Sequence, residues 1–124
     1  MTEFKKMKIV VIDDEQEILD MLKDFLSDKG YNVITTLSGK KGFEVVKQEL
    51  PDLVITDLLL PEQHGLDVLS QIKDELFIPV IAISGIYKKY EVNKYIQDRF
   101  GDGFIEKPIN LEKLLKMIED ILNE

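Results

Sequence analysis

The stretch Lys8-Ile-Val-Val-Ile-Asp-Asp14 places four consecutive β-branched apolar residues directly before a pair of carboxylates. A strand that is apolar on consecutive positions is buried on both faces, as in a parallel sheet. From Glu15 the apolar spacing changes to three and four through Ile18, Leu22 and Leu26, and Gly30 follows as a helix stop. The stretch therefore predicts a buried strand that leads into an amphipathic helix.

The same alternation continues to the end of the chain. Further strands are predicted at residues 31–36, 53–56, 79–83 and 103–105. The apolar positions that predict the intervening and closing helices are Phe43, Val46 and Leu50, then Leu66, Leu69 and Ile72, then an irregular segment over 87–100, and finally Leu111, Leu114, Leu115, Ile118 and Ile121. Five such units predict an α/β fold, a doubly wound, five-stranded parallel sheet with helices on both faces.

Length and composition narrow the class of protein. With 124 residues the chain has room for one core, so we expect residues 1–124 to form a single domain. The net charge of −8 argues against binding to nucleic acid or to an anionic membrane, since both require a basic face. The absence of cysteine excludes disulfides, thiolate metal sites and thiol nucleophiles. Without a signal sequence or a long apolar run, a cytoplasmic protein is expected.

Polar side chains follow four of the five predicted strands. Asp13 and Asp14 follow the first, Asp57 the third, Ser84 the fourth and Lys107 the fifth. In a parallel sheet these positions meet at one edge, where ligands bind. Three neighbouring carboxylates stay ionised only beside positive charge, and hard oxygen ligands suit Mg²⁺. With an ammonium and a hydroxyl added, the set predicts a phosphoryl site around one carboxylate nucleophile.

Taken one at a time, these residues have structural interpretations that the sequence leaves open. Asp14 with Glu17 fits a capping arrangement at the start of the first helix. Asp57 and Ser84 are both residue types that cap turns and helices, and a loop lysine is commonly solvated. These separate interpretations do not explain why all of the residues fall at the ends of strands.

On these residues, the chain resembles the receiver domain of two-component response regulators over its whole length. The matching segments are Val10-Val-Ile-Asp-Asp-Glu15, Asp57-Leu-Leu-Leu-Pro61 with Gly65, Ile83-Ser84-Gly85, and Phe104-Ile-Glu-Lys-Pro108. The resemblance implies a flavodoxin-like sheet with strand order 2-1-3-4-5.

The resemblance also implies a role for each site residue. Asp57 would accept a phosphoryl group from a phosphohistidine on a sensor histidine kinase or a histidine phosphotransfer protein. Mg²⁺ would be held by Asp13, Asp14 and Asp57 together with the backbone carbonyl of Leu59. Lys107, joined to Pro108 by a cis peptide bond, would pair with the phosphoryl group.

A conformational switch is implied as well. Ser84 would bond a phosphoryl oxygen, and Phe104 would turn its ring into the space that this movement opens. The surface made by the fourth helix, the fifth strand and the fifth helix would then change for an output protein or domain that the sequence does not identify. A chain of this kind catalyses its own phosphorylation and dephosphorylation, and is not an enzyme that turns over a separate substrate.

Two other functions compete with this interpretation. A Mg²⁺-dependent phosphohydrolase with an Asp nucleophile usually carries a second Asp two residues after the first, where this chain has Leu59, and it needs a cap domain. A degenerate receiver that acts only as a binding module would lack an acidic, hydroxyl or lysine position, and none is missing here.

Overall fold

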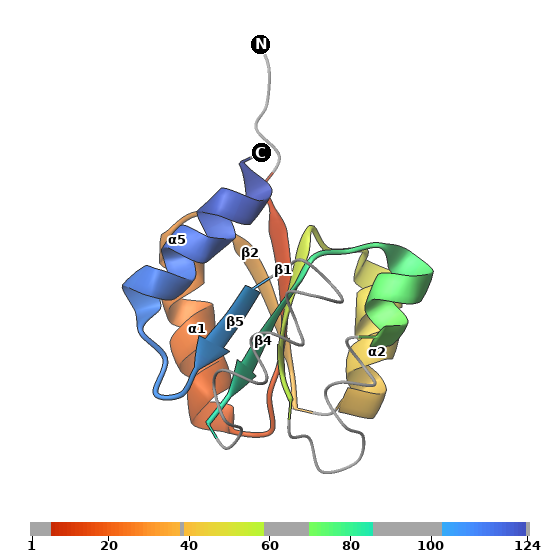
Figure 1. Ribbon diagram of the computed structural model, residues 1–124, viewed down its shortest axis with the longest axis horizontal. Coiled ribbons are helices and arrows are strands. Elements are labelled where there is room, and N and C mark those ends of the chain that lie inside the picture. Colours follow the sequence, from red (N-terminus) through yellow and green to blue (C-terminus); the bar gives the residue numbers. More distant parts are fainter. Residues whose placement is uncertain (1–5, 38, 59–69, 86–102, 124) are drawn as a thin grey trace.

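The computed structural model describes residues 6–37, 39–58, 70–85 and 103–123, the coloured parts of the ribbon in Figure 1. The expected helix over 87–100 lies outside these residues, as do Leu66 and Leu69 of the expected third helix. The described residues include a complete five-stranded sheet, so the predicted topology can be compared with it directly.

All neighbouring strands of the sheet are parallel. The strands are β1 (Lys8–Ile12), β2 (Asn32–Thr36), β3 (Leu53–Asp57), β4 (Val80–Ser84) and β5 (Gly103–Glu106). They pair in the order β2-β1-β3-β4-β5, which confirms the predicted order. The predicted strand bounds differ from the observed ones by no more than one residue at either end.

Helices cover both faces of the sheet (Figure 1). One face carries α1 (Gln16–Asp28) and α5 (Leu111–Leu122), and the other carries α2 (Gly39–Glu49) and the short helix η1 (Ile72–Leu76). Side chains of a strand alternate between the faces, so Ile9 and Val11 pack with α1 and α5, whereas Val10 and Ile12 pack with α2 and η1. The consecutive apolar run in β1 is therefore explained by burial on both sides.

One helix ends differently from the prediction, and another ends in an unusual turn. The second helix was expected to include Leu50, but α2 ends at Glu49 and Leu50 has a left-handed φ of 45°. The physical reason is Pro51, which disfavours helical geometry in the residue before it. The third helical segment ends in a π turn, in which the Phe77 N–H donates to the Ile72 carbonyl at 3.0 Å.

The end of α1 agrees with its prediction, since Gly30 follows it with a φ of 97°. Glycine adopts this conformation without a Cβ clash, which makes it a common residue after a helix. Within the described ranges, no helix combines the length and the apolar character that crossing a bilayer would require.

Candidate functional site

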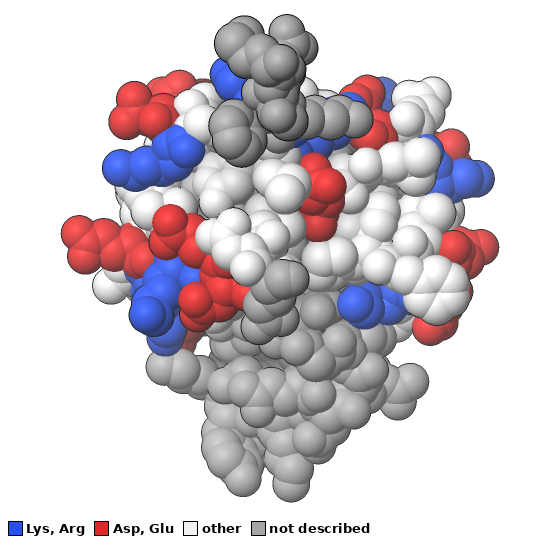
Figure 2. Space-filling model, turned by 90° about the horizontal axis from the view of Figure 1, so that it is seen from above, with Lys and Arg blue, Asp and Glu red and all other residues white. Residues whose placement is uncertain are grey.

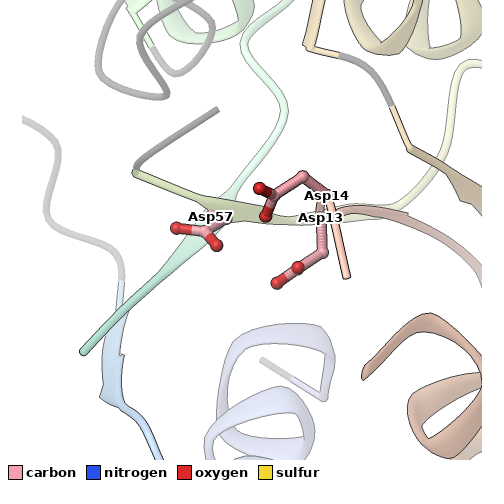
Figure 3. A group of neighbouring side chains, drawn as sticks. All are labelled: Asp13, Asp14 and Asp57. Carbon is pink, nitrogen blue, oxygen red and sulfur yellow. The ribbon is translucent and has the colours of Figure 1, made fainter. Parts of the chain in front are cut away.

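Three carboxylates meet at the carboxyl edge of the sheet, as predicted from the strand ends. Asp13 and Asp14 directly follow β1, and Asp57 is the last residue of β3 (Figure 3). One oxygen from each of these carboxylates lies within 4.8 Å of the others. The two strands are paired in parallel, with Ile12 opposite Thr56, and this register brings the side chains together.

Burial sets two of these three carboxylates apart from surface acids. Asp13 and Asp57 are buried, whereas Asp14 is exposed. Burial raises the pKa of Asp13 from 3.8 to about 6, although a hydrogen bond from the Glu15 N–H and the charge of Lys107 act in the opposite direction. The fold therefore holds a carboxyl group where ionisation is costly without a cation beside it.

Lys107 supplies one positive charge to this cluster. Its ammonium donates to Asp57 Oδ2 at 2.9 Å, and it lies 3.3 Å from Asp13 Oδ2. Partial burial on its own would lower the pKa of Lys107, but the hydrogen bond to Asp57 and the neighbouring carboxylates outweigh it and raise that pKa. The ammonium therefore stays charged at neutral pH.

The loops after β4 and β5 position this lysine. The Lys107 N–H donates to the Ser84 carbonyl at 3.0 Å, and the peptide bond to Pro108 is cis, as expected. Gly85 lies close against the side chain: a Cβ at Gly85 would stand 3.1 Å from the Lys107 Cβ. Glycine thus allows the strand-four loop to approach the stem of the lysine.

The two carboxylate oxygens of Asp13 differ: one accepts a hydrogen bond from the backbone, and the other is placed to bind a cation. Oδ1 accepts a hydrogen bond from the Glu15 N–H at 2.8 Å. Oδ2 is buried and accepts no hydrogen bond from any described residue, since its contact with the Lys107 ammonium is an ion pair without hydrogen-bond geometry. A buried carboxylate oxygen of this kind, beside two further carboxylates, fits a hard divalent cation such as Mg²⁺.

The capping interpretation of Asp14 is wrong. The N-cap residue of α1 is Glu15, not Asp14, and the Glu15 side chain forms no capping hydrogen bond. Asp13, rather than Asp14, bonds the backbone at the start of this helix. Glu15 was missed as a site neighbour, although its carboxylate lies 3.8 Å from the Lys107 ammonium. Its place directly after the acidic pair is the signal that could have identified it.

The two residues expected to act as a switch lie on adjacent strands. Ser84 is the last residue of β4 and is buried, and it follows Ile83, the residue paired with Asp57. Phe104 is buried in β5 opposite Ala82, within the core that faces α2 and η1. By strand alternation Ser84 faces the same side as Ala82, so the hydroxyl and the ring share one face of the sheet.

Leu59, whose backbone carbonyl was expected as a metal ligand, lies outside the described residues. The described site consists of the acidic cluster, Lys107, Ser84 and the buried Phe104. It joins a nucleophilic carboxylate, a fixed ammonium and candidate ligands for a divalent cation, a set suited to phosphoryl transfer.

Comparisons with known proteins agree with this geometry. Residues 9–119 match the family model of the response regulator receiver domain. A receiver domain protein from Clostridium thermocellum is similar, with 29% identity, a TM-score of 0.87 and coverage of 94% of each chain. A CheY-like receiver domain protein from Methanospirillum hungatei shows 28% identity, a TM-score of 0.85, and coverage of 96% of this chain and 95% of its own.

A more distant structure shares the fold alone. A two-component response regulator from Clostridium difficile superposes with a TM-score of 0.88 at 23% identity. The match covers 96% of this chain and 98% of that one. The flavodoxin-like arrangement is therefore shared even where the sequences have diverged widely.

Proposed function

The chain belongs to the response regulator receiver domain family of two-component systems, and on that premise we propose that Asp57 accepts a phosphoryl group from a phosphohistidine. The donor would be a sensor histidine kinase or a histidine phosphotransfer protein, and residues 1–124 would act as one receiver domain. A carboxylate oxygen of Asp57 attacks phosphorus while the P–N bond breaks. The bonding electron pair returns to the imidazole nitrogen, which leaves as neutral imidazole after taking up a proton.

The acidic cluster supports a requirement for Mg²⁺. Asp13, Asp14 and Asp57 would hold the ion, with the backbone carbonyl of Leu59 as a further ligand. When bound, Mg²⁺ supplies positive charge that offsets the carboxylates and the incoming phosphoryl oxygens. The buried Asp13 Oδ2, which accepts no hydrogen bond from the described residues, is the feature that favours such a ligand.

Lys107 and Ser84 would stabilise the phosphorylated state. Lys107 already contacts the carboxylate that is to be modified, so its ammonium can pass to a phosphoryl oxygen with little movement. Ser84 ends the neighbouring strand and would donate its hydroxyl hydrogen to another phosphoryl oxygen. The chain would act once on itself, and would be restored by hydrolysis, rather than turn over a separate substrate.

The observation that carries this proposal is the 2.9 Å contact between the Lys107 ammonium and Asp57, inside a cluster of three carboxylates. Incubation with acetyl phosphate and Mg²⁺, followed by intact mass measurement, tests it. The wild type is expected to gain the mass of one phosphoryl group, and a chelator should prevent this. Asp57→Asn should gain nothing.

Asp52→Asn provides the matched control, because Asp52 lies before the same strand at the opposite edge of the sheet. This variant should be phosphorylated as the wild type is. A Mg²⁺-dependent mass increment that persists in Asp57→Asn would assign the phosphoryl group to another residue.

The switch can be followed separately, because the chain contains no tryptophan. We expect the fluorescence of the Phe104→Trp variant to change on phosphorylation, as the ring moves relative to Ser84. Phe77→Trp, at an exposed position after η1, should show no such change. Equal responses in the two variants would contradict a role for Phe104.

A further inference from the structure

Glu15 contacts the site lysine from the solvent side. Three carboxylates lie near the Lys107 ammonium, with Asp57 Oδ2 at 2.9 Å, Asp13 Oδ2 at 3.3 Å and Glu15 Oε1 at 3.8 Å. The side chains of Asp13 and Asp57 are 0% and 6% exposed, whereas that of Glu15 is 59% exposed. A phosphodonor arrives from solvent, so Glu15 is the one of these three carboxylates that an arriving donor meets first.

The backbone, rather than the side chain, of Glu15 serves the local fold. Its N–H donates to Asp13 Oδ1 at 2.8 Å, and its carbonyl accepts hydrogen bonds from the Ile18 and Leu19 N–H groups at the start of α1. The carboxylate forms no capping hydrogen bond with the helix. Formation of α1 therefore does not explain why an acidic side chain stands beside Lys107.

The charges of the proposed site balance without Glu15. The carboxylates of Asp13, Asp14 and Asp57 carry three negative charges when all of them are ionised. The Lys107 ammonium carries one positive charge, and a divalent cation supplies two when it is bound. Glu15 therefore adds a fourth negative charge to a set of groups whose charges otherwise cancel.

An ion pair at the amino edge of the sheet, where the strands begin, gives a comparison. There the Lys8 ammonium contacts the Glu49 carboxylate at 3.1 Å and donates to the Glu49 carbonyl at 3.2 Å. Figure 2 shows this end of the molecule, where acidic and basic side chains lie beside one another. Glu15 instead approaches an ammonium that two closer carboxylates already share, so its own charge is offset only in part.

We propose that Glu15 is a specificity-determining residue that slows phosphorylation of Asp57 by small, strongly anionic phosphodonors such as acyl phosphates. This inference rests on the function proposed above. An acyl phosphate brings two negative charges, and its phosphoryl oxygens need the ammonium of Lys107, which Glu15 also contacts. Glu15 therefore repels the donor and competes with it for the lysine.

The reaction itself needs no further component. An Asp57 oxygen attacks phosphorus, the P–O bond to the acyl group breaks, and the electron pair leaves on the carboxylate product. Glu15 takes no part in these bond changes, so its effect is on the approach and binding of the donor.

Phosphorylation by acetyl phosphate, followed by intact mass at saturating Mg²⁺ and low salt, tests this proposal. Glu15→Gln removes the charge and keeps the backbone contacts, so the rate should rise about threefold or more. Glu15→Lys should raise the rate further, whereas Glu15→Asp should stay close to the wild type. High salt should reduce the differences, because ions screen exposed charges.

Phosphoramidate is the second donor, because it carries one negative charge less than acetyl phosphate at neutral pH. The ratio of the acetyl phosphate rate to the phosphoramidate rate should rise in Glu15→Gln, and this ratio does not depend on the folded fraction. Glu17→Gln is the matched control, since it neutralises an exposed carboxylate in the first turn of α1 and gives the same net charge. Its rates with both donors should equal those of the wild type.

The outcomes separate this inference from the proposed function. A wild type that neither donor phosphorylates would overturn both. If the wild type is phosphorylated, an unchanged rate ratio in Glu15→Gln, or an equal change in Glu17→Gln, would overturn the inference alone. A Glu15→Lys variant that acetyl phosphate modifies no faster than Glu15→Gln would overturn it as well, because the effect would not follow the charge.

Discussion

Two lysine–carboxylate pairs lie at opposite edges of the sheet with similar contact distances and different surroundings. At the carboxyl edge, Lys107 and Asp57 are 2.9 Å apart, and their side chains are 19% and 6% exposed. At the amino edge, Lys8 and Glu49 are 3.1 Å apart and 30% and 38% exposed. Water screens the second pair and leaves it weak, whereas the first is held in a partly dry site with further carboxylates.

The comparison shows that burial, rather than contact distance, decides how strongly each ion pair affects the stability of the fold. The carboxyl edge holds charged side chains that are largely buried, and the amino edge holds apolar side chains that are exposed to solvent. Each arrangement opposes folding of the isolated chain, so each is expected to show itself in the stability of variants.

The largest expected effect comes from breaking the buried pair. Lys107→Met keeps most of the side-chain stem but leaves the Asp13 and Asp57 carboxylates without their ammonium. We expect a loss of about 3 kcal/mol in the free energy of unfolding at neutral pH. Urea denaturation measures it, and added Mg²⁺ should recover part of the loss. Lys113→Met, at an exposed position in α5, is the control and should change little.

The second expected effect is a gain in the free energy of unfolding, and it comes from removing the buried charge of Asp13. Burial raises the pKa of Asp13 to about 6, so the folded chain holds this proton more tightly than the unfolded chain does. The stability contributed by this group is therefore present at low pH and lost as the pH rises from about 4 to about 6.

Asp13→Asn removes this cost and keeps the acceptor for the Glu15 N–H. In the presence of a chelator, the variant should gain about 2 kcal/mol at pH 7 relative to the wild type. Most of the gain should disappear near pH 4. Asp14→Asn, which changes an exposed carboxylate of the same cluster, should shift stability much less. A gain that does not depend on pH would show that ionisation of Asp13 is not the cause.

A smaller stabilisation is expected at the amino edge. Leu50→Asn places a residue that tolerates left-handed geometry at a φ of 45°, and should raise the free energy of unfolding by about 0.5–1 kcal/mol. Urea denaturation in dilute solution measures it. Leu37→Asn has no left-handed backbone to relieve and should show no gain. An equal gain in both variants would show that replacing an exposed leucine with a polar residue, rather than relieving the left-handed backbone, causes the effect.

The smallest effect should come from the exposed pair. Lys8→Met removes the contact with Glu49 and should lower stability by about 0.5 kcal/mol. High salt should reduce the difference from the wild type, because it screens solvent-exposed charges. A loss as large as that of Lys107→Met would contradict the contrast between the two edges.

The sequence was sufficient to predict the sheet and the neighbours at its carboxyl edge. Consecutive β-branched residues mark strands buried on both faces, and parallel pairing then brings Asp13, Asp57 and Lys107 together. The sequence left open whether Asp14 caps the first helix, because two adjacent aspartates offer equivalent side chains and only the path of the backbone selects Asp13 for the hydrogen bond.

The helix ends at the amino edge were harder to predict. Leu50 matches the apolar spacing of a helix, so its spacing gave no sign of a left-handed conformation, and only the following Pro51 indicated a boundary. Phe77 is two residues before a proline, too far for that restriction to apply. Ile72, the first residue of the π turn before it, is buried in the core against the sheet, a tertiary contact that local spacing does not specify.

The register of β3 has a consequence for quality control of the protein. Ile12 lies opposite Thr56, and Asp57 lies opposite Ile83. A slip of β3 by one residue would turn Asp57 to the other face of the sheet, away from Asp13 and Lys107. A chain with that error keeps its mass, composition and most of its helices, yet has lost the geometry proposed for the phosphoacceptor. The phosphorylated fraction of a preparation would then count the correctly assembled molecules, so the proposed modification reports on folding without any added probe.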